Sequence, residues 1–300
     1  MKNILIVIVG PTASGKTHLS FNIAKKFNGE IICADSRTIY KGLIIGTASP
    51  ALDPKYKTIR HHLLHFVEPN YPFTVAEFQT LANQTIEDIQ KRGKLPLLVG
   101  GTGLYVDAIT KGFQIPHSPP DLKLRERLEK EKTENLYFEL KKIDPVATEK
   151  IELNNKRRII RALEVFLNTG IRFSDQQKKK KPLYKILILG IKLEREELYK
   201  KINRRVEAQM KQGFLNEVKG LIKKGYTLEH PAMSGLGYKQ LYLHLMESNP
   251  PSLHDAVQQI KTETRHFARR QISWFKRDSR IKWVKNKKEA ENLIRKFLKL

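Results

Sequence analysis

A glycine-rich stretch near the start of the sequence has residue types suited to holding phosphate groups. The pattern G-x-x-x-x-G-K-[ST] is matched by Gly10, Pro11, Thr12, Ala13, Ser14, Gly15, Lys16 and Thr17. In this pattern, backbone N–H groups and the start of the following helix surround a di- or triphosphate. The lysine adds a positive charge at the outer phosphate, and the threonine hydroxyl can bind Mg²⁺. We therefore predict a phosphate site with Lys16 as its cation, Thr17 as its metal ligand and Mg²⁺ as its cofactor. The pattern leaves open which phosphate compound binds.

Two further polar groups follow apolar runs. Asp35 comes directly after the run from Glu30 to Ala34. A carboxylate there can bind Mg²⁺ or activate a hydroxyl, as in a small-molecule kinase, or it can accept a proton from a nitrogen nucleophile. A purely structural role is the third alternative. Thr102 follows the run from Leu95 to Val99, at a strand end where an ATPase would carry an aspartate. This departure argues against ATP hydrolysis and leaves the Thr102 hydroxyl to hydrogen-bond an anionic ligand.

A parallel sheet is needed to bring these groups together. Continuous apolar runs predict buried parallel strands at Ile4 to Val9, Glu30 to Ala34, Leu95 to Val99, Ile186 to Leu193 and Ile281 to Val284. Helical periodicity fills the segments between several of them, most clearly from Val75 to Gln90. The alternation predicts an α/β fold with a P-loop NTPase-like parallel sheet core, in which ligands bind at the carboxyl ends of the strands.

The sequence texture changes in the middle of the chain. Pro116, Pro119 and Pro120 mark a break, and the segment from Asp121 to Gly170 is helix-patterned throughout. A lysine run at Lys178 to Lys181 closes it. We predict an all-helical insertion domain at residues 116–183, between the two parts of the core at residues 1–115 and 184–300.

The charge balance favours a polyanionic partner. Lys and Arg number 56 against 31 Asp and Glu, a formal net charge of +25. From Arg265 to Arg277 there is no acidic residue, and helical spacing places seven polar side chains, most of them cationic, within roughly 140° of the helix circumference. Such a stripe favours phosphate contact, because surface helices normally mix charges of both signs. In the insertion, Arg157, Arg158 and Arg161 form a smaller basic group, for which an ion pair with Glu164 is a rival interpretation.

Other residue classes narrow the setting. Cys33 is the one cysteine of the sequence, which excludes an internal disulfide and favours a buried apolar role and a reducing, cytoplasmic location. His61, His62 and His65 lie close together without a carboxylate at a known ligand spacing, so we expect packing and hydrogen bonding, and no zinc. The sequence holds no apolar run long enough to span a membrane.

The motifs taken together resemble the tRNA dimethylallyltransferase (tRNA isopentenyltransferase) family of the bacterial type. The resemblance is carried, in the family's order, by GPTASGKT, ADS with Tyr40, IGTASP, HHLL, LLVGGTGLY, RRIIRALEVF, GLGYKQ and TRHFARRQISWF. It implies transfer of a dimethylallyl group from dimethylallyl pyrophosphate to the exocyclic N6 of the adenosine on the 3′ side of the anticodon. It also implies roles for three residues: Asp35 as the base that takes the amine proton, and Thr102 and Lys16 as groups that stabilise the leaving pyrophosphate.

The predicted partners are the tRNA anticodon stem-loop and the prenyl pyrophosphate, with the protein acting as a monomer. Predicted tRNA contacts are Asp35, Ser36, Arg37, Thr38, Thr102, Arg125, Arg157, Arg158, Arg161, Gly237, Tyr238, Lys239, Arg265, Arg269, Arg270, Gln271 and Lys276. The sequence departs from the family at Thr38, where Gln is usual, and at Lys239, where Arg is commoner. Rival hypotheses are a small-molecule kinase, an RNA-binding module without turnover, and a prenyltransferase acting on free adenine nucleotides.

Overall fold

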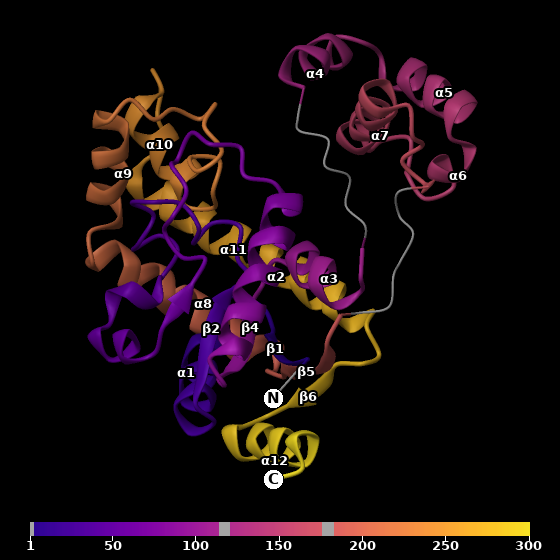
Figure 1. The fold of residues 1–300 in the computed structure, drawn as a ribbon. Helices are drawn as coiled ribbons and strands as arrows, with labels where there is room; N and C mark the ends of the chain where they lie inside the picture. The colour runs from indigo at the N-terminus through magenta and orange to yellow at the C-terminus, as the bar shows by residue number, and fades with distance from the viewer. Residues whose placement is uncertain (1–2, 114–120, 176–182) are drawn as a thin grey trace. The chain divides into compact units, whose positions relative to one another are not determined.

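The computed structural model describes residues 3–113, 121–175 and 183–300, and the chain divides into two compact units (Figure 1). The first unit contains the residues up to 73, residues 78–106 and residues 183–300. The second contains residues 74–77 and 107–182. The predicted boundary between residues 115 and 116, the three prolines and the lysine run all lie outside the described residues.

A parallel sheet forms the centre of the first unit. Its strands, in spatial order, are β3 (His61–His62), β2 (Gly29–Cys33), β4 (Leu95–Gly100), β1 (Ile4–Val9), β5 (Lys185–Ile191) and β6 (Lys282–Val284). Every pairing is parallel. The five predicted strands are therefore confirmed. Strand β3 was not predicted, because two residues are too few to show a period.

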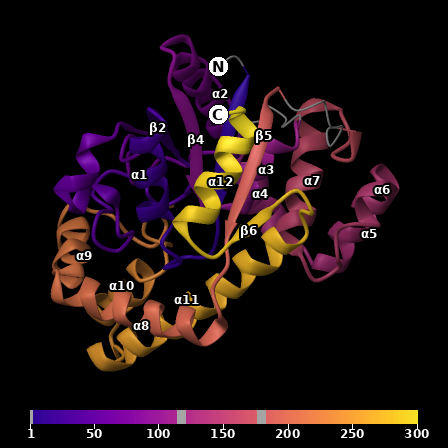
Figure 2. The ribbon, with the colours of Figure 1, turned by 90° about the horizontal axis from the view of Figure 1, so that it is seen from below.

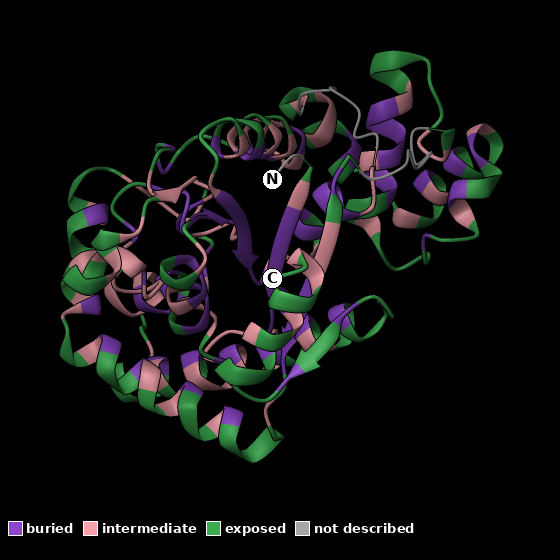
Figure 3. Cartoon of the chain, turned by 60° about the horizontal axis from the view of Figure 1, so that its bottom comes forward, coloured by how far each residue is buried: buried purple, intermediate pink, exposed green. Residues whose placement is uncertain are grey.

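Eight further helices of the described residues pack on this sheet or on the helices next to it. They are α1 (Lys16–Lys26), α2 (Val75–Lys91), α3 (Gly103–Thr110), α8 (Arg195–Lys211), α9 (Phe214–Lys223), α10 (Tyr238–Met246), α11 (Leu253–Lys276) and α12 (Lys287–Leu298). Helices α1 and α12 cover one face, where Ile23 and Ile294 pack with Ile6, Ile8 and Leu97 in one apolar core. Helix α2 lies over the opposite face (Figures 1 and 2). Burial on both faces explains why the central strands β1 and β4 are apolar along their whole length (Figure 3).

Helices α8 to α11 contribute to a second apolar core. Phe214 and Val218 of α9, Tyr238 and Leu241 of α10 and Ile260 of α11 pack together in it. The loop after β2 joins the same core. This arrangement places the loop between the sheet and the helices, at the carboxyl edge where ligands are expected.

The second unit is built on helices α4 (Leu122–Glu129), α5 (Thr133–Ile143), α6 (Pro145–Thr148) and α7 (Lys156–Thr169). Its core holds a fully buried carboxylate, Glu164, which accepts hydrogen bonds from the guanidinium groups of Arg125 and Arg161. Burial would raise the pKa of Glu164, but these bonds hold it below its ordinary value. The ion pair between Arg161 and Glu164, which was the rival interpretation of this basic group, is therefore present in the structure.

A cluster of charges stabilises the amino-terminal end of the sheet. Glu30, 2% exposed on β2, accepts hydrogen bonds from Arg92, Lys94 and His62 at 2.5–2.8 Å. Arg92 above all, with Lys94 and His62, holds the pKa of Glu30 well below its usual range, against the raising effect of burial. The cluster replaces the solvent that the buried carboxylate has lost.

Replacing Glu30 with glutamine is expected to lower the free energy of unfolding by about 3 kcal/mol at pH 7, because three donors lose a charged acceptor. The folded-state pKa is depressed, so this stabilisation is present above the unfolded pKa of about 4.3 and is lost as the pH falls through the folded value. Urea denaturation from pH 7 to pH 3 measures it. Glu68→Gln, which removes an exposed pair with Lys41, serves as control with an expected loss of under about 1 kcal/mol. Equal losses for the two variants would contradict the prediction.

Candidate active site

The phosphate loop connects β1 to α1 and is closed by its own lysine. The Lys16 ammonium donates hydrogen bonds to the carbonyls of Gly10 and Pro11 at 2.9 and 2.8 Å. Ala13 has a φ of 61° and Gly15 a φ of 93°, a left-handed geometry that turns successive N–H groups into a concave nest. The Ser14 hydroxyl is buried there without a hydrogen-bond partner among the described residues. The loop therefore has the form of an anion cradle.

Helix α11 holds this loop through Gln271. The Gln271 side chain accepts a hydrogen bond from the Thr12 N–H at 2.8 Å and donates one to the Gly101 carbonyl at 2.9 Å. Both ends of the amide are thus occupied, and the side chain is 5% exposed. The predicted contact of Gln271 with tRNA stays a prediction; in the structure, the residue lines the smaller cavity and positions the phosphate loop against the end of β4.

The two polar groups predicted at the strand ends lie together. The Thr102 hydroxyl accepts the Ser36 N–H at 3.0 Å, and Ser36 follows Asp35 directly. One oxygen of Asp35, Oδ1, accepts the N–H groups of Arg37 and Thr38 at 2.8 and 3.4 Å. At Gly100, an added Cβ would lie 1.9 Å from the Ala34 carbonyl oxygen, so glycine is required where β2 and β4 end side by side. In the described residues, the second oxygen of Asp35 has no hydrogen-bond partner.

An arginine that was not predicted completes the site. Arg205 of α8 donates a hydrogen bond to the Thr47 carbonyl at 2.8 Å, and no carboxylate among the described residues forms a salt bridge with it. Burial lowers its pKa, and the charge of Asp35 opposes that shift. Burial likewise lowers the pKa of Lys16 to about 8, with Asp35 opposing the shift and Arg205 adding to it. Two half-buried cations and one carboxylate therefore influence each other in one place.

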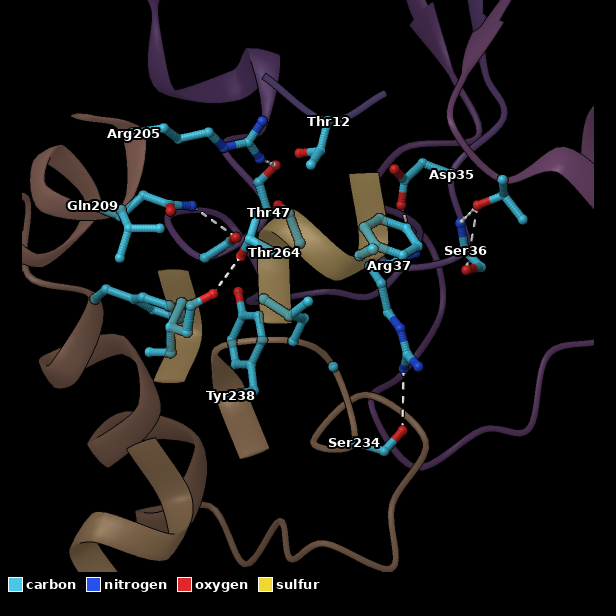
Figure 4. Close-up of a pocket in the computed structure, with 18 of the residues that line it drawn as sticks. Thr12, Asp35, Ser36, Arg37, Thr47, Arg205, Gln209, Ser234, Tyr238 and Thr264 are labelled. Atoms are coloured by element: carbon cyan, nitrogen blue, oxygen red, sulfur yellow. Dashed lines mark hydrogen bonds between the residues drawn. The ribbon is translucent and has the colours of Figure 1, made fainter. Parts of the chain in front are cut away.

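These groups line two adjoining cavities. The first, of about 390 Å³, is lined by Asp35, Thr102, Arg205, Tyr238 and Arg270, among others (Figure 4). The second, of about 110 Å³, contains Lys16, Thr17 and Ser20. Residues Thr12, Asp35, Thr47, Arg205 and Phe267 line both, so the phosphate loop and the Asp35 carboxylate open onto one continuous space.

The other predicted tRNA residues of the first unit divide by exposure. Lys239, Arg269, Arg270 and Lys276 are exposed, and Arg265 is half-buried beside the Tyr199 ring. Arg37, by contrast, donates to the Pro231 carbonyl and the Ser234 hydroxyl (Figure 4).

Three further predicted tRNA residues are buried: Thr38, Gly237 and Tyr238. Their burial is at odds with contact at the surface. Thr38 and Tyr238 reach a ligand only through the cavity walls that they line.

The predicted tRNA arginines of the second unit also differ. Arg157 and Arg158 are exposed on α7. Arg125 and Arg161 are bonded to Glu164, so their guanidinium groups already have a carboxylate partner.

The predicted hydrogen bonding of the histidines is confirmed. His61 bonds to the Ile59 carbonyl, His62 to Glu30, and His65 to Ser49 and the Tyr40 carbonyl. Cys33 is buried, and burial raises its pKa to about 12, as expected for an inert thiol. Within residues 3–113, 121–175 and 183–300, no three His, Cys, Asp or Glu side chains are grouped to hold a metal ion. None of the helices in this part of the chain is long and apolar enough to cross a membrane.

The parallel sheet and the phosphate loop opening onto a carboxylate-lined cavity define a P-loop α/β protein. Residues 38–278 match the family described as IPP transferase. The chain is 42% identical to the tRNA dimethylallyltransferase of Anoxybacillus flavithermus (93% of this chain, 89% of the relative) and 45% identical to that of Roseiflexus castenholzii (91% and 90%). The chain belongs to the IPP transferase family, and the resemblance found in the sequence is confirmed.

Comparison with solved structures agrees with this family assignment. The tRNA isopentenylpyrophosphate transferase of Bacillus halodurans has a TM-score of 0.74 and 36% identity, over 99% of this chain and 97% of that one. A eukaryotic dimethylallyltransferase acting on tRNA has a TM-score of 0.77 and 30% identity, over 91% and 70%. The predicted fold class is confirmed by both.

Proposed function

We propose that this chain transfers a dimethylallyl group from dimethylallyl pyrophosphate to N6 of the adenosine on the 3′ side of the anticodon in tRNA, releasing pyrophosphate. The observation that carries the proposal is the continuous space shared by the Lys16 loop and Asp35. A leaving pyrophosphate at the loop and an acceptor nitrogen beside Asp35 would be adjacent in that space. The exposed cations of α11 supply a surface for the RNA backbone.

Each residue has a task in this reaction. As the C–O bond to the pyrophosphate breaks and the N–C bond forms, Lys16 and Arg205 bind the growing negative charge and the Thr102 hydroxyl donates a hydrogen bond to it. The unbonded oxygen of Asp35 accepts the proton that the amine loses. Because the target base must leave its stack to reach the cavity, we expect a flipped adenosine.

The residues present also fit Mg²⁺. Thr17 and Ser20 line the small cavity with Asp35, and this ion is usually held by one or two protein carboxylates together with substrate phosphates and water, with the hydroxyl of the phosphate loop as a further ligand. Thr17 would be its ligand, and the ion would supply charge to the pyrophosphate oxygens. The partners proposed are thus the anticodon stem-loop and the prenyl pyrophosphate, in the cytoplasm.

The proposal is tested by mixing the purified protein and Mg²⁺ with an anticodon stem-loop RNA, adding either dimethylallyl pyrophosphate or ATP, and measuring RNA mass. One added prenyl group, only with the prenyl donor, is the expected result. Unchanged RNA, with ADP formed in the presence of a small acceptor, would overturn it in favour of a kinase.

Pyrophosphate binding is expected to take up protons above pH 8. The pKa of Lys16 is lowered to about 8 by burial in the free protein, and a bound anion favours the ammonium form and raises it. Affinity therefore falls as the pH rises above about 8, because the lysine must be protonated to bind. Calorimetry in buffers of different ionisation enthalpy measures the uptake. Lys16→Met should abolish the proton uptake, whereas Lys25→Met, which changes an exposed lysine of the same helix, should leave it unchanged. Pyrophosphate binding by the unaltered protein that does not depend on pH would contradict the assignment of Lys16 as the cation that is protonated on binding.

A further inference from the structure

Glu217, on α9, lies behind the wall of the larger cavity and binds the loop that forms this wall. Its Oε2 accepts the N–H groups of Ile44 and Ile45 at 3.0 and 2.7 Å. Its Oε1 accepts the Gly46 N–H at 3.0 Å and the Tyr238 hydroxyl at 2.6 Å. One carboxylate thus satisfies three consecutive amides and a phenol, four donors that no neutral side chain of this size could accept together.

The carbonyl side of the same loop is held by α8. Gln209 donates to the carbonyls of Ile45 and Gly46, both at 2.8 Å, and Arg205 donates to the Thr47 carbonyl (Figure 4). The loop is therefore fixed between a carboxylate on α9 and two donors on α8. Any shift of its backbone moves the Thr47 carbonyl, to which Arg205 is bonded.

The packing leaves the loop little room to adjust. A Cβ at Gly46 would lie 2.2 Å from the Phe214 ring and 2.6 Å from the Tyr238 ring. These two rings pack edge to face at 5.0 Å and line the cavity beside Gly46. The loop thus lies directly against aromatic rings, and its position is set by hydrogen bonds to Glu217 and Gln209.

We infer that Glu217 is a positioning residue that fixes the Arg205 guanidinium for the pyrophosphate by holding the backbone of residues 44–47. The inference rests on the proposed function for the identity of the anion. Glu217 itself does not line the cavity. Its effect must therefore pass through the loop, and it should be coupled to that of Arg205.

The test is a double-mutant cycle of Glu217→Gln with Arg205→Lys, with the affinity for Mg²⁺-pyrophosphate as the readout. Glutamine presents N–H groups to backbone N–H groups, so Glu217→Gln should weaken pyrophosphate binding and raise the KM of the prenyl donor by about tenfold, with RNA affinity unchanged. The double variant should be no weaker than the worse single variant. Multiplicative effects, an unchanged affinity in Glu217→Gln, or a loss confined to RNA binding would each overturn the inference.

Two further variants secure the result. Tyr238→Phe removes one of the four hydrogen bonds to Glu217 and keeps the ring. If Glu217→Gln does not fold, this variant replaces it in the test. A loss of pyrophosphate affinity smaller than about tenfold then supports the inference, and an unchanged affinity overturns it. Glu207→Gln, which removes an exposed acid paired with Lys261, is the matched control and should bind as the unaltered protein does. Pyrophosphate binding can be measured whether or not prenyl transfer occurs, so failure of the proposed function would be seen separately.

Discussion

Replacing Asp35 with asparagine is expected to lower kcat for prenyl transfer by about 10²- to 10⁴-fold, the usual contribution of a general base. The carbonyl oxygen of asparagine can still accept the N–H groups of Arg37 and Thr38 that Asp35 now binds. The loop is therefore retained, and what is lost is the oxygen that takes the proton. Pyrophosphate and RNA affinities should stay within about threefold, because neither ligand depends on this oxygen for its main charge contacts.

Single-turnover transfer to a stem-loop RNA measures the rate, and calorimetry measures the two affinities. Asp53→Asn, an exposed acid paired with Lys55, is the control and should transfer at the normal rate. A rate for Asp35→Asn close to normal would exclude a base role. A large fall in RNA affinity with a normal bound rate would assign Asp35 to binding instead.

The parts of the site that could be predicted from the sequence are those made by one local segment. The phosphate loop is a contiguous pattern between a strand and a helix, so Lys16 and Thr17 were identifiable at once. Asp35 and Thr102 were identifiable because each follows a buried strand, and the carboxyl ends of neighbouring parallel strands meet. The hydrogen bond between Ser36 and Thr102 is the direct result of that rule.

The parts that could not be predicted depend on contacts between distant segments. Arg205 and Gln209 lie in a helix of mixed charge that is typical of a solvated surface. One signal was available: Leu198, Ile202, Val206 and Gln209 form the buried face of α8, where a polar residue needs a partner, and Arg205 lies next to this face. The same limit explains Gln271, which lies in the cation-rich segment from Arg265 to Arg277 but on the helix face that points inward to Thr12. Periodicity assigns a face to such a residue, whereas only tertiary packing identifies its partner.

Arg205→Met is expected to lower kcat/KM for the prenyl donor by about 10²- to 10³-fold, the effect of removing one preorganised charge contact to a developing anion. The expected effect on stability has the opposite sign. Arg205 is a half-buried cation without a carboxylate salt bridge in the described residues, and loss of solvent lowers its pKa. Its replacement should therefore leave the free energy of unfolding unchanged or raise it, although the Thr47 carbonyl loses a donor.

Steady-state kinetics and urea denaturation of the same protein separate these two effects. Arg204→Met changes the preceding residue, which is exposed on α8, and should alter neither quantity. A loss of activity accompanied by an equal loss of stability would show that Arg205 acts through the Thr47 loop alone. Loss of activity at full stability is the result expected if Arg205 binds the anion. The free-energy cost of removing its charge from solvent is then offset only when the pyrophosphate is bound.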